Sequence, residues 1–263
     1  MDQPDAPTSA EPAAGVLYLV GTPIGNRDDC SPRAQRVLAG VDRIACEDTR
    51  RSGLLLQQLG LGGRPLLSFH AHNESARIPS LLAGLEAGES LALISDAGLP
   101  GISDPGEGLV AAARARGIRV VCVPGPCALT TALVSSGLPS GRFCFEGFLP
   151  PRSAARRRRL QELADEPRTL VLYEAPHRLV ALLEDLLDVL GDRPLQVARE
   201  LTKRHEQQVG PTIAAALDYF RSTAPLGECT LVLAGAPPRQ PLWDAEGLRE
   251  ELRRLRDSGL SSQ

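Results

Sequence analysis

The chain has 263 residues, of which 43% are hydrophobic and 23% are charged, and its formal net charge is −3. This is the composition of a globular protein with one large or two modest domains, and its overall charge repels nucleic acid, so phosphate contacts would need a local basic patch. The six cysteines include no C-x-x-C pair, and no apolar run approaches the ~18 residues of a membrane span, so neither a zinc framework nor a membrane partner is expected. The first segment, residues 1–14, is rich in proline and alanine and is predicted to be the disordered tail of a cytoplasmic protein.

Short apolar runs alternate with helical patterns in the first half of the chain. Strands are predicted at residues 16–20, 43–46, 65–69, 91–94 and 119–123, with helices near 31–38, 52–59, 73–87, 106–116 and 128–136. Such alternation is typical of βαβ units. We therefore predict an N-terminal α/β domain over residues 15–138, built on a mostly parallel five-stranded sheet with helices on both faces.

The pattern changes after the glycine- and proline-rich segment 137–141. Strands are predicted at residues 143–148, 169–173, 195–200 and 229–234, with helices near 177–190 and 211–220. These elements predict a second α/β domain over residues 139–236, with a mixed sheet. Residues 237–263 form a charged tail, with a helix expected from 244 to about 256.

Three loops rich in glycine and proline follow the first, fourth and fifth predicted strands, at residues 20–26, 95–106 and 123–128. The first is neither a G-x-G-x-x-G turn nor a P-loop. The second holds three glycines, two prolines and two aspartates, and its Asp104 is expected to cap the next helix. Because these loops leave one edge of a parallel sheet, they predict one small-molecule crevice.

Polar clusters follow the second and third strands. Glu47 and Asp48 are either paired carboxylates for acid–base work or acidic residues favoured at the start of a helix. His70 and His72 have no obvious third partner for a metal, and capping by Asn73 is the alternative, so no metal site is predicted.

Two features of the second half concern charge. Arg152 and the run of four arginines at 156–159 are either a phosphate patch or a solvated face. Lys203 is the only lysine of the chain, and it can act as a compact point charge or, with a shifted pKa, lose its proton, which arginine cannot do.

Eight segments occur together in the order and near the spacing of one family: 20–26, 47–50, 70–74, 95–106, 124–128, 142–150, 173–178 and 198–203. On these segments the chain resembles the ribosomal RNA small subunit methyltransferase I family, which belongs to the tetrapyrrole methylase superfamily. The resemblance covers about residues 15–235, and the motifs at 95–106 and 198–203 are its specific parts.

The resemblance implies two α/β domains with S-adenosylmethionine in the cleft between them, usually as a homodimer. It implies methylation of the ribose 2′-oxygen of a cytidine in the decoding region of 16S rRNA in the small ribosomal subunit. The cofactor residues carried over are Thr22, Pro23, Ile24, Gly25, Asp96, Ala97, Gly98, Leu99, Ile102, Pro124, Cys127, Ala128, Tyr173, Glu174 and Ala175.

A ribose hydroxyl needs a base to become a good nucleophile. The candidate catalytic residues are Lys203, Glu200, Glu47, Asp48 and Glu174. The candidate RNA contacts are Arg50, His72, Asn73, Arg152, Arg156, Arg157, Arg158, Arg159 and Arg178.

The chain departs from the family in two places. The family commonly has threonine where this chain has Leu99, so a hydroxyl contact is lost while a backbone contact can remain. The family also continues beyond the tail helix, so the tail of this chain is shortened relative to it.

Two other functions are compatible with these patterns. One is a methyltransferase for a corrinoid or porphyrin precursor, against which the arginine-rich segment and the Lys203 motif argue. The other is a non-catalytic RNA- or nucleotide-binding protein, against which the intact cofactor loops argue.

Overall fold

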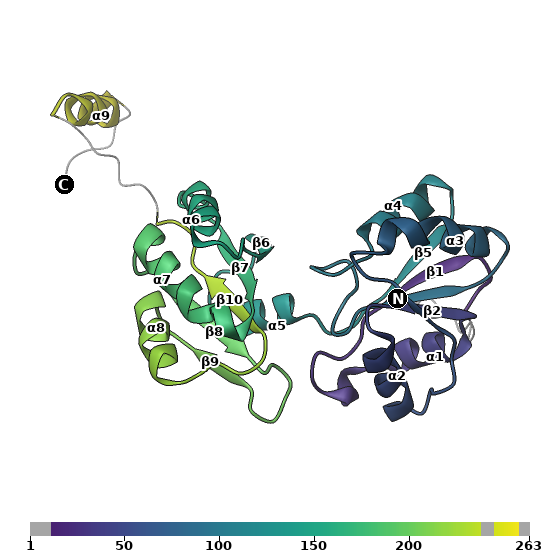
Figure 1. Cartoon of the computed structure of the whole chain (residues 1–263). Coiled ribbons are helices and arrows are strands. Elements are labelled where there is room, and N and C mark those ends of the chain that lie inside the picture. The colour runs from purple at the N-terminus through teal and green to yellow at the C-terminus, as the bar shows by residue number, and fades with distance from the viewer. Residues whose placement is uncertain (1–11, 238–244, 258–263) are drawn as a thin grey trace, which may run out of the picture.

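The computed structural model describes residues 12–237 and 245–257, and it contains two five-stranded sheets (Figure 1). The first sheet is entirely parallel, in the order β3-β2-β4-β1-β5. Its strands are β1 (Val16–Val20), β2 (Arg43–Cys46), β3 (Leu66–Ser68), β4 (Leu91–Ile94) and β5 (Arg119–Val123). The polar and glycine-rich loops therefore all leave its carboxyl edge, as predicted.

Helices cover both faces of this sheet. On one face α1 (Pro32–Gly40) and α2 (Thr49–Gln58) bury Leu38 and Leu56 among side chains of β1, β2 and β4. On the other face α3 (Glu74–Glu86) and α4 (Glu107–Ala115) bury Leu82 and Leu109. Burying a leucine side chain stabilises a fold by about 1.5–3 kcal/mol, so each face carries a substantial core.

The second sheet is mixed, in the order β6-β7-β10-β8-β9. Its strands are β6 (Phe143–Phe148), β7 (Thr169–Glu174), β8 (Leu195–Arg199), β9 (Gln207–Val209) and β10 (Cys229–Leu233). Only β6 and β7 are parallel; the other neighbours are antiparallel. Three helices cover one of its faces: α6 (Ser153–Glu162), α7 (Leu179–Leu190) and α8 (Ile213–Ser222).

The helix α5 (Ala128–Ser135) packs on the opposite face of the second sheet. Leu129 and Leu133 are buried in a cluster with Val171, Ala198 and Val232. By packing, α5 therefore groups with the C-terminal sheet, although the sequence pattern assigned residues 15–138 to the N-terminal domain. We propose that the domain boundary lies between β5 and α5, at residues 124–127.

The fold class is confirmed: two α/β units, one parallel and one mixed, with a cavity between them. Three elements were not predicted: α6, β9 and the single-turn 3-10 helix Arg27–Asp29. Four arginines hide the helical pattern of α6, and the other two elements have only three residues each. The tail helix α9 (Ala245–Asp257) is present as expected. Residues 1–11 of the segment predicted to be disordered lie outside the described residues. The same holds for residues 238–244 and 258–263 of the tail. Among the described residues, no helix has the length and apolar character required to cross a bilayer.

Candidate active site

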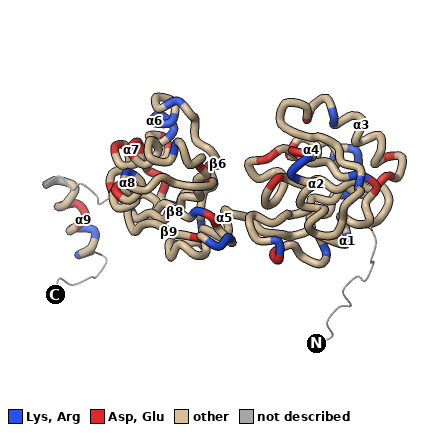
Figure 2. The backbone as a smooth tube through the Cα atoms, turned by 60° about the horizontal axis from the view of Figure 1, so that its bottom comes forward, with Lys and Arg blue, Asp and Glu red and all other residues tan. Residues whose placement is uncertain are grey.

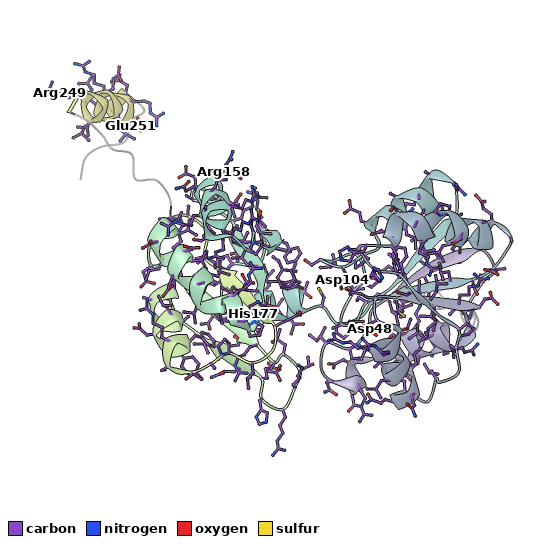
Figure 3. The ribbon with its side chains drawn as sticks, viewed as in Figure 1. Asp48, Asp104, Arg158, His177, Arg249 and Glu251 are labelled. Carbon is purple, nitrogen blue, oxygen red and sulfur yellow. The ribbon has the colours of Figure 1, made fainter. Side chains whose placement is uncertain are left out.

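A cavity of about 510 Å³ lies where the two domains face each other. On the N-terminal side, the loops after β1, β2, β4 and β5 form its wall, at the carboxyl edge where parallel sheets bind ligands. On the C-terminal side, the wall comes from β6, β7, the loop between β8 and β9, and the start of β10. Figure 3 shows Asp104 on the side of the N-terminal domain that faces the other domain. The cavity is lined by Ile24, Glu47, Arg51, Asp96, Ala97, Gly98, Leu99, Ile102, Ser103, Asp104, Cys127, Ala128, Phe148, Tyr173, Glu200, Leu201, Lys203, Glu228 and Thr230.

Hydrogen bonds hold the loops after β1 and β4 together. Thr22 and Gly98 exchange two backbone bonds, with N···O distances of 2.9 and 3.1 Å, and the buried Thr22 hydroxyl donates to the Ser95 carbonyl at 3.2 Å. The loop after β5 is equally close, since a methyl group at Gly21 would lie 2.6 Å from the Gly125 Cα. Gly98 has a φ of +87°, a conformation that glycine adopts without steric cost. The loops after β1, β4 and β5 are therefore firmly connected to one another on the N-terminal wall of the cavity.

Five carboxylates and two cations line the cavity. Arg51 pairs with Asp96 at 3.1 Å, and Lys203 pairs with Glu200 at 2.8 Å. Within the described residues, three lining carboxylates have no ion-pair partner: Glu47, Asp104 and Glu228. The cavity consequently has an excess of negative charge and suits a cationic ligand.

Two of these carboxyl groups hold their protons more tightly than usual. Desolvation raises the pKa of Asp104 to about 6, and the charge of Glu47 raises it too, while a hydrogen bond from Ser95 lowers it. Desolvation also raises the pKa of Glu47, assisted by the charge of Asp96. A carboxyl group with a pKa near 6 exchanges its proton close to neutral pH, which is the property that a general base requires.

The loop between β8 and β9 brings the only lysine to the cavity. Glu200 and Thr202 have φ values of +51° and +65°, a left-handed conformation that costs free energy in residues other than glycine. The Glu200 side chain packs over Gly227, and the stem of Lys203 packs against Gly25 of the other domain. Strained residues held by packing on both sides are typical of functional loops.

Tyr173 connects β7 to the start of α5. Its hydroxyl accepts a hydrogen bond from the Leu129 backbone N–H at 3.0 Å, which satisfies one of the free donors at the beginning of that helix. This bond places Cys127 and Ala128, which precede Leu129, on the cavity wall.

Most of the predicted cofactor residues lie on the cavity wall. Those that line it are Ile24, Asp96, Ala97, Gly98, Leu99, Ile102, Cys127, Ala128 and Tyr173. Those outside the lining are Thr22, Pro23, Gly25, Pro124, Glu174 and Ala175. Thr22 and Gly25 support the wall through the contacts described above, and the cofactor contacts themselves stay predictions.

The predicted catalytic residues divide into two groups. Glu47, Glu200 and Lys203 line the cavity. Asp48 does not: its carboxylate accepts from the Arg50 backbone N–H at 2.8 Å, caps α2 and pairs with the Arg50 side chain, which lowers its pKa to about 2. A helix cap with so low a pKa is a poor base, so we withdraw Asp48 as a catalytic candidate.

Glu174 is also outside the cavity lining. It is fully buried, accepts a hydrogen bond from the Ala175 backbone N–H at 2.8 Å and lies 3.1 Å from Arg178. Arg178 in turn donates to the Leu149 carbonyl at 2.7 Å. We therefore replace a catalytic role for Glu174 and an RNA contact for Arg178 with a structural ion pair.

The arginine run does not act as one patch. Figure 2 shows the basic residues clustered at α6, but their side chains have different surroundings. Arg156 is 3% exposed, its guanidinium contacts Asp185 at 2.6 Å, and it donates to the Ala181 carbonyl. The prediction of a phosphate contact is wrong for Arg156, because a helix turns about 100° per residue and this position faces α7.

The other arginines near this helix remain accessible. Arg157 bridges Asp185 and Asp188, and Arg159 pairs with Glu146 at 2.7 Å. Arg158 makes only a 3.8 Å contact with Glu162 and points to solvent in Figure 3, and Arg152 is exposed at the start of α6. Arg152 and Arg158 are consequently the better candidates for phosphate.

The remaining RNA predictions lie after β2 and β3, outside the cavity lining. Arg50 and His72 are exposed and keep that prediction. The Asn73 side chain accepts from the His70 backbone N–H at 2.8 Å and donates to the Ser68 carbonyl at 3.2 Å, so it shapes the turn. We withdraw Asn73 as an RNA contact.

Sequence reasoning missed several lining residues: Arg51, Ser103, Asp104, Phe148, Leu201, Glu228 and Thr230. Asp104 was expected to cap the next helix, but the residue at the start of α4 is Gly106, without a side-chain cap. The signal for Asp104 was present, since it lies in the glycine-rich loop that predicted the crevice. Glu228 precedes a buried strand and carried no such signal.

A family model described as Tetrapyrrole (Corrin/Porphyrin) Methylases matches residues 16–217. The chain is 53% identical to ribosomal RNA small subunit methyltransferase I of Synechocystis sp., covering 94% of this chain and 89% of that protein. It is 48% identical to the protein of the same name from Escherichia coli O157:H7, covering 92% and 85%.

A solved structure gives the fold independently. Uroporphyrin-III C-methyltransferase from Thermus thermophilus, complexed with S-adenosyl homocysteine, superposes with a TM-score of 0.56 at 20% identity, covering 83% of this chain and 96% of that one. At that identity the likeness concerns the fold alone. The family match and the relatives at about half identity over most of the chain lead to one conclusion: the chain belongs to the ribosomal RNA small subunit methyltransferase I family of tetrapyrrole methylases.

Proposed function

We propose that this protein transfers a methyl group from S-adenosylmethionine to the ribose 2′-hydroxyl of a cytidine in the decoding region of 16S rRNA. The observation that carries the proposal is the acidic cavity at the carboxyl edge of the parallel sheet, in a chain 53% identical to a ribosomal RNA small subunit methyltransferase I over nearly its whole length. The proposed substrate places the reaction in the cytoplasm.

The charge and the volume of the cavity support this cofactor. S-adenosylmethionine carries a positively charged sulfur and an ammonium group, and Glu47, Asp104 and Glu228 are lining carboxylates without an ion pair in the described part of the chain. The left-handed Gly98 brings backbone without a side chain to the cavity wall. A cavity of about 510 Å³ is in the usual range for sites of molecules of this size.

When bound, the cofactor supplies a methyl group that is already activated by the positive sulfur. The protein must align the ribose oxygen with that methyl group and remove the hydroxyl proton. Lys203 has three N–H donors and no acceptor, so we assign it to hold the 2′-oxygen or an adjacent phosphate. Asp104 and Glu47 are the acceptors we propose for the proton, because desolvation raises the pKa of each.

Binding of the RNA backbone is assigned to exposed cations. Arg152 at the N-cap of α6, Arg158 on α6 and Arg50 on the N-terminal domain are exposed. Each phosphate that such a cation neutralises releases counterions, so RNA affinity should fall steeply with salt. A homodimer, implied by the family resemblance, is part of the proposal and is checked by light scattering of the purified protein.

The deciding experiment supplies labelled S-adenosylmethionine and purified protein to small ribosomal subunits from cells that lack this gene. We expect label in a 2′-O-methylcytidine of the decoding region, with no label in subunits from cells that carry the gene, because their site is already methylated. Labelling of a tetrapyrrole precursor instead would refute the acceptor while retaining the cofactor. A protein that binds the cofactor and methylates neither would refute the enzymatic function.

A further inference from the structure

The chain exposes one phenylalanine inside the cavity. Aromatic residues make up only 3% of the sequence, and two of its five phenylalanines, Phe69 and Phe220, are buried. Phe148, at the end of β6, is 44% exposed and lines the cavity. A large apolar ring exposed in a cavity carries a hydration cost that a ligand removes by covering it.

The orientation of this ring is fixed by its neighbours. Phe148 packs edge-on against Tyr173, with ring centroids 5.7 Å apart. Tyr173 is itself held by Phe145, at 5.0 Å, and by the hydrogen bond from the Leu129 backbone N–H. The ring is therefore held in place, and a flat group that stacks on it loses little of the protein's conformational freedom.

A second exposed apolar group reaches the same cavity from the other domain. Ile102 is 39% exposed and lines the cavity. The next residue, Ser103, has a φ of +60° and meets β6 at Gly147, where a methyl group would lie 3.0 Å from the Ser103 hydroxyl oxygen. Phe148 follows Gly147, so both apolar side chains are next to one contact between the domains. The cavity therefore offers apolar surface from both domains, which suits a flat, weakly polar group such as a nucleobase.

The charges nearby favour RNA as the source of that group. The unpaired carboxylates that suit the cofactor's cationic groups come from Glu47, Asp104 and Glu228, whereas β6 leads directly into Arg152 and the basic helix α6. Cations that hold phosphates next to an aromatic ring are the usual combination in single-stranded RNA recognition.

We propose that Phe148 is the stacking platform for the base of the target nucleotide, with Ile102 contributing from the facing domain. This inference rests on the proposed function, because it takes RNA as the acceptor. An enzyme that modifies a nucleotide within folded RNA must hold that nucleotide outside its stack, and an aromatic ring at the cavity replaces part of the lost stacking. Phe148 is thus assigned to substrate binding rather than to the chemistry.

The test compares Phe148→Ala, Phe148→Tyr and the control Phe143→Ala. Phe143 lies on the same strand and is 38% exposed, but it is outside the cavity lining. Stacking on an aromatic side chain contributes about 1–3 kcal/mol per base, so Phe148→Ala should lower kcat/KM for small ribosomal subunits roughly 5- to 160-fold. Phe148→Tyr should retain most of the wild-type kcat/KM, and Phe143→Ala should leave kcat/KM unchanged.

Calorimetric titration with S-adenosylmethionine distinguishes the two groups that could stack on Phe148, the base of the target nucleotide and the adenine of the cofactor. The Kd for the cofactor should stay within about twofold in all three variants. If Phe148→Ala lowers the cofactor affinity by the same factor as it lowers kcat/KM, Phe148 stacks on the cofactor's adenine, and the proposal is overturned. Unchanged kcat/KM in Phe148→Ala would also overturn it. Wild-type protein that binds the cofactor but methylates no rRNA would refute the proposed function instead, whatever the variants do.

Discussion

Replacing Asp104 by asparagine tests the electrostatics of the cavity most directly. The side chain keeps its shape and loses its charge. Burial and the neighbouring acids raise the pKa of Asp104 from 3.8 to about 6. As pH rises above 3.8, the unfolded chain therefore releases this proton before the folded protein does, and the unfolding free energy falls between about pH 4 and pH 6.

The size of this effect follows from the pKa difference. A shift of about two units, at about 1.4 kcal/mol per unit, limits it to about 3 kcal/mol, and solvent at the cavity mouth reduces it to about 1–3 kcal/mol. Asp104→Asn should thus be more stable than wild type at pH 7.5 by that amount, and equally stable below pH 4. Its activity should be strongly reduced, because the proton acceptor is lost.

The assay is urea unfolding of both proteins between pH 3.5 and 8, together with kcat/KM between pH 5 and 8. Wild-type kcat/KM should rise with pH through an apparent pKa near 6, the value of Asp104, to which burial and the charge of Glu47 contribute. In Asp104→Asn that rise should be absent. A variant that is less stable than wild type at pH 7.5, or one with unchanged activity and pH dependence, would refute the reasoning.

Two further predictions concern charged residues. Lys203→Ala should lower kcat by about 10²–10³-fold, as expected when a donor to a reacting oxygen is removed, with little change in cofactor Kd; normal turnover would exclude the assigned role. Arg156→Ala should lower the unfolding free energy by about 3 kcal/mol in urea titrations, the low end of the range for a broken buried pair, because Asp185 loses its buried partner but keeps the half-exposed Arg157. Arg158→Ala should keep stability but weaken RNA binding at low salt. Equal stability of these two arginine variants would contradict the separation of the arginine run into a buried and an exposed face.

The strands and the crevice were predictable from the sequence because each has a strong local signal. Apolar runs such as Leu91–Ile94 are bounded by glycine, serine and aspartate, and three loops with unusual glycine and proline content leave one sheet edge. Because the carboxyl ends of parallel strands converge, loop composition alone was enough to predict that the loops carrying Gly98 and Cys127 line one cavity.

The errors arise where a residue's role depends on what lies opposite in space. Asp104 is a residue type typical of helix caps, and only its burial in the folded cavity, together with the charges of Glu47 and Glu228, raises its pKa. Arg156 and Arg158 belong to the same run of four arginines, and no local sequence signal distinguishes them. In the structure, Arg156 faces Asp185 and Arg158 faces solvent. The helix α5 is apolar on the side that packs, and nothing local decides which of two sheets it covers.

Gly25 gives a last prediction, about how the two domains hold the site together. It lines no part of the cavity, but a methyl group at this position would lie 2.5 Å from Lys203 Cγ and 2.9 Å from the Leu201 carbonyl oxygen. Real side chains do not approach so closely, so Gly25→Ala must push the loop that carries Lys203 away from the loop after β1. Neither domain core is touched, and the expected result is a melting temperature within about 2 °C of wild type with kcat/KM reduced at least tenfold, since small displacements of reacting groups are costly. Gly141→Ala is the matched control, because a methyl group there meets nothing within 4 Å. If Gly25→Ala kept full activity, the contact between the domains would not position Lys203, and the strained conformations of Glu200 and Thr202 would need another explanation.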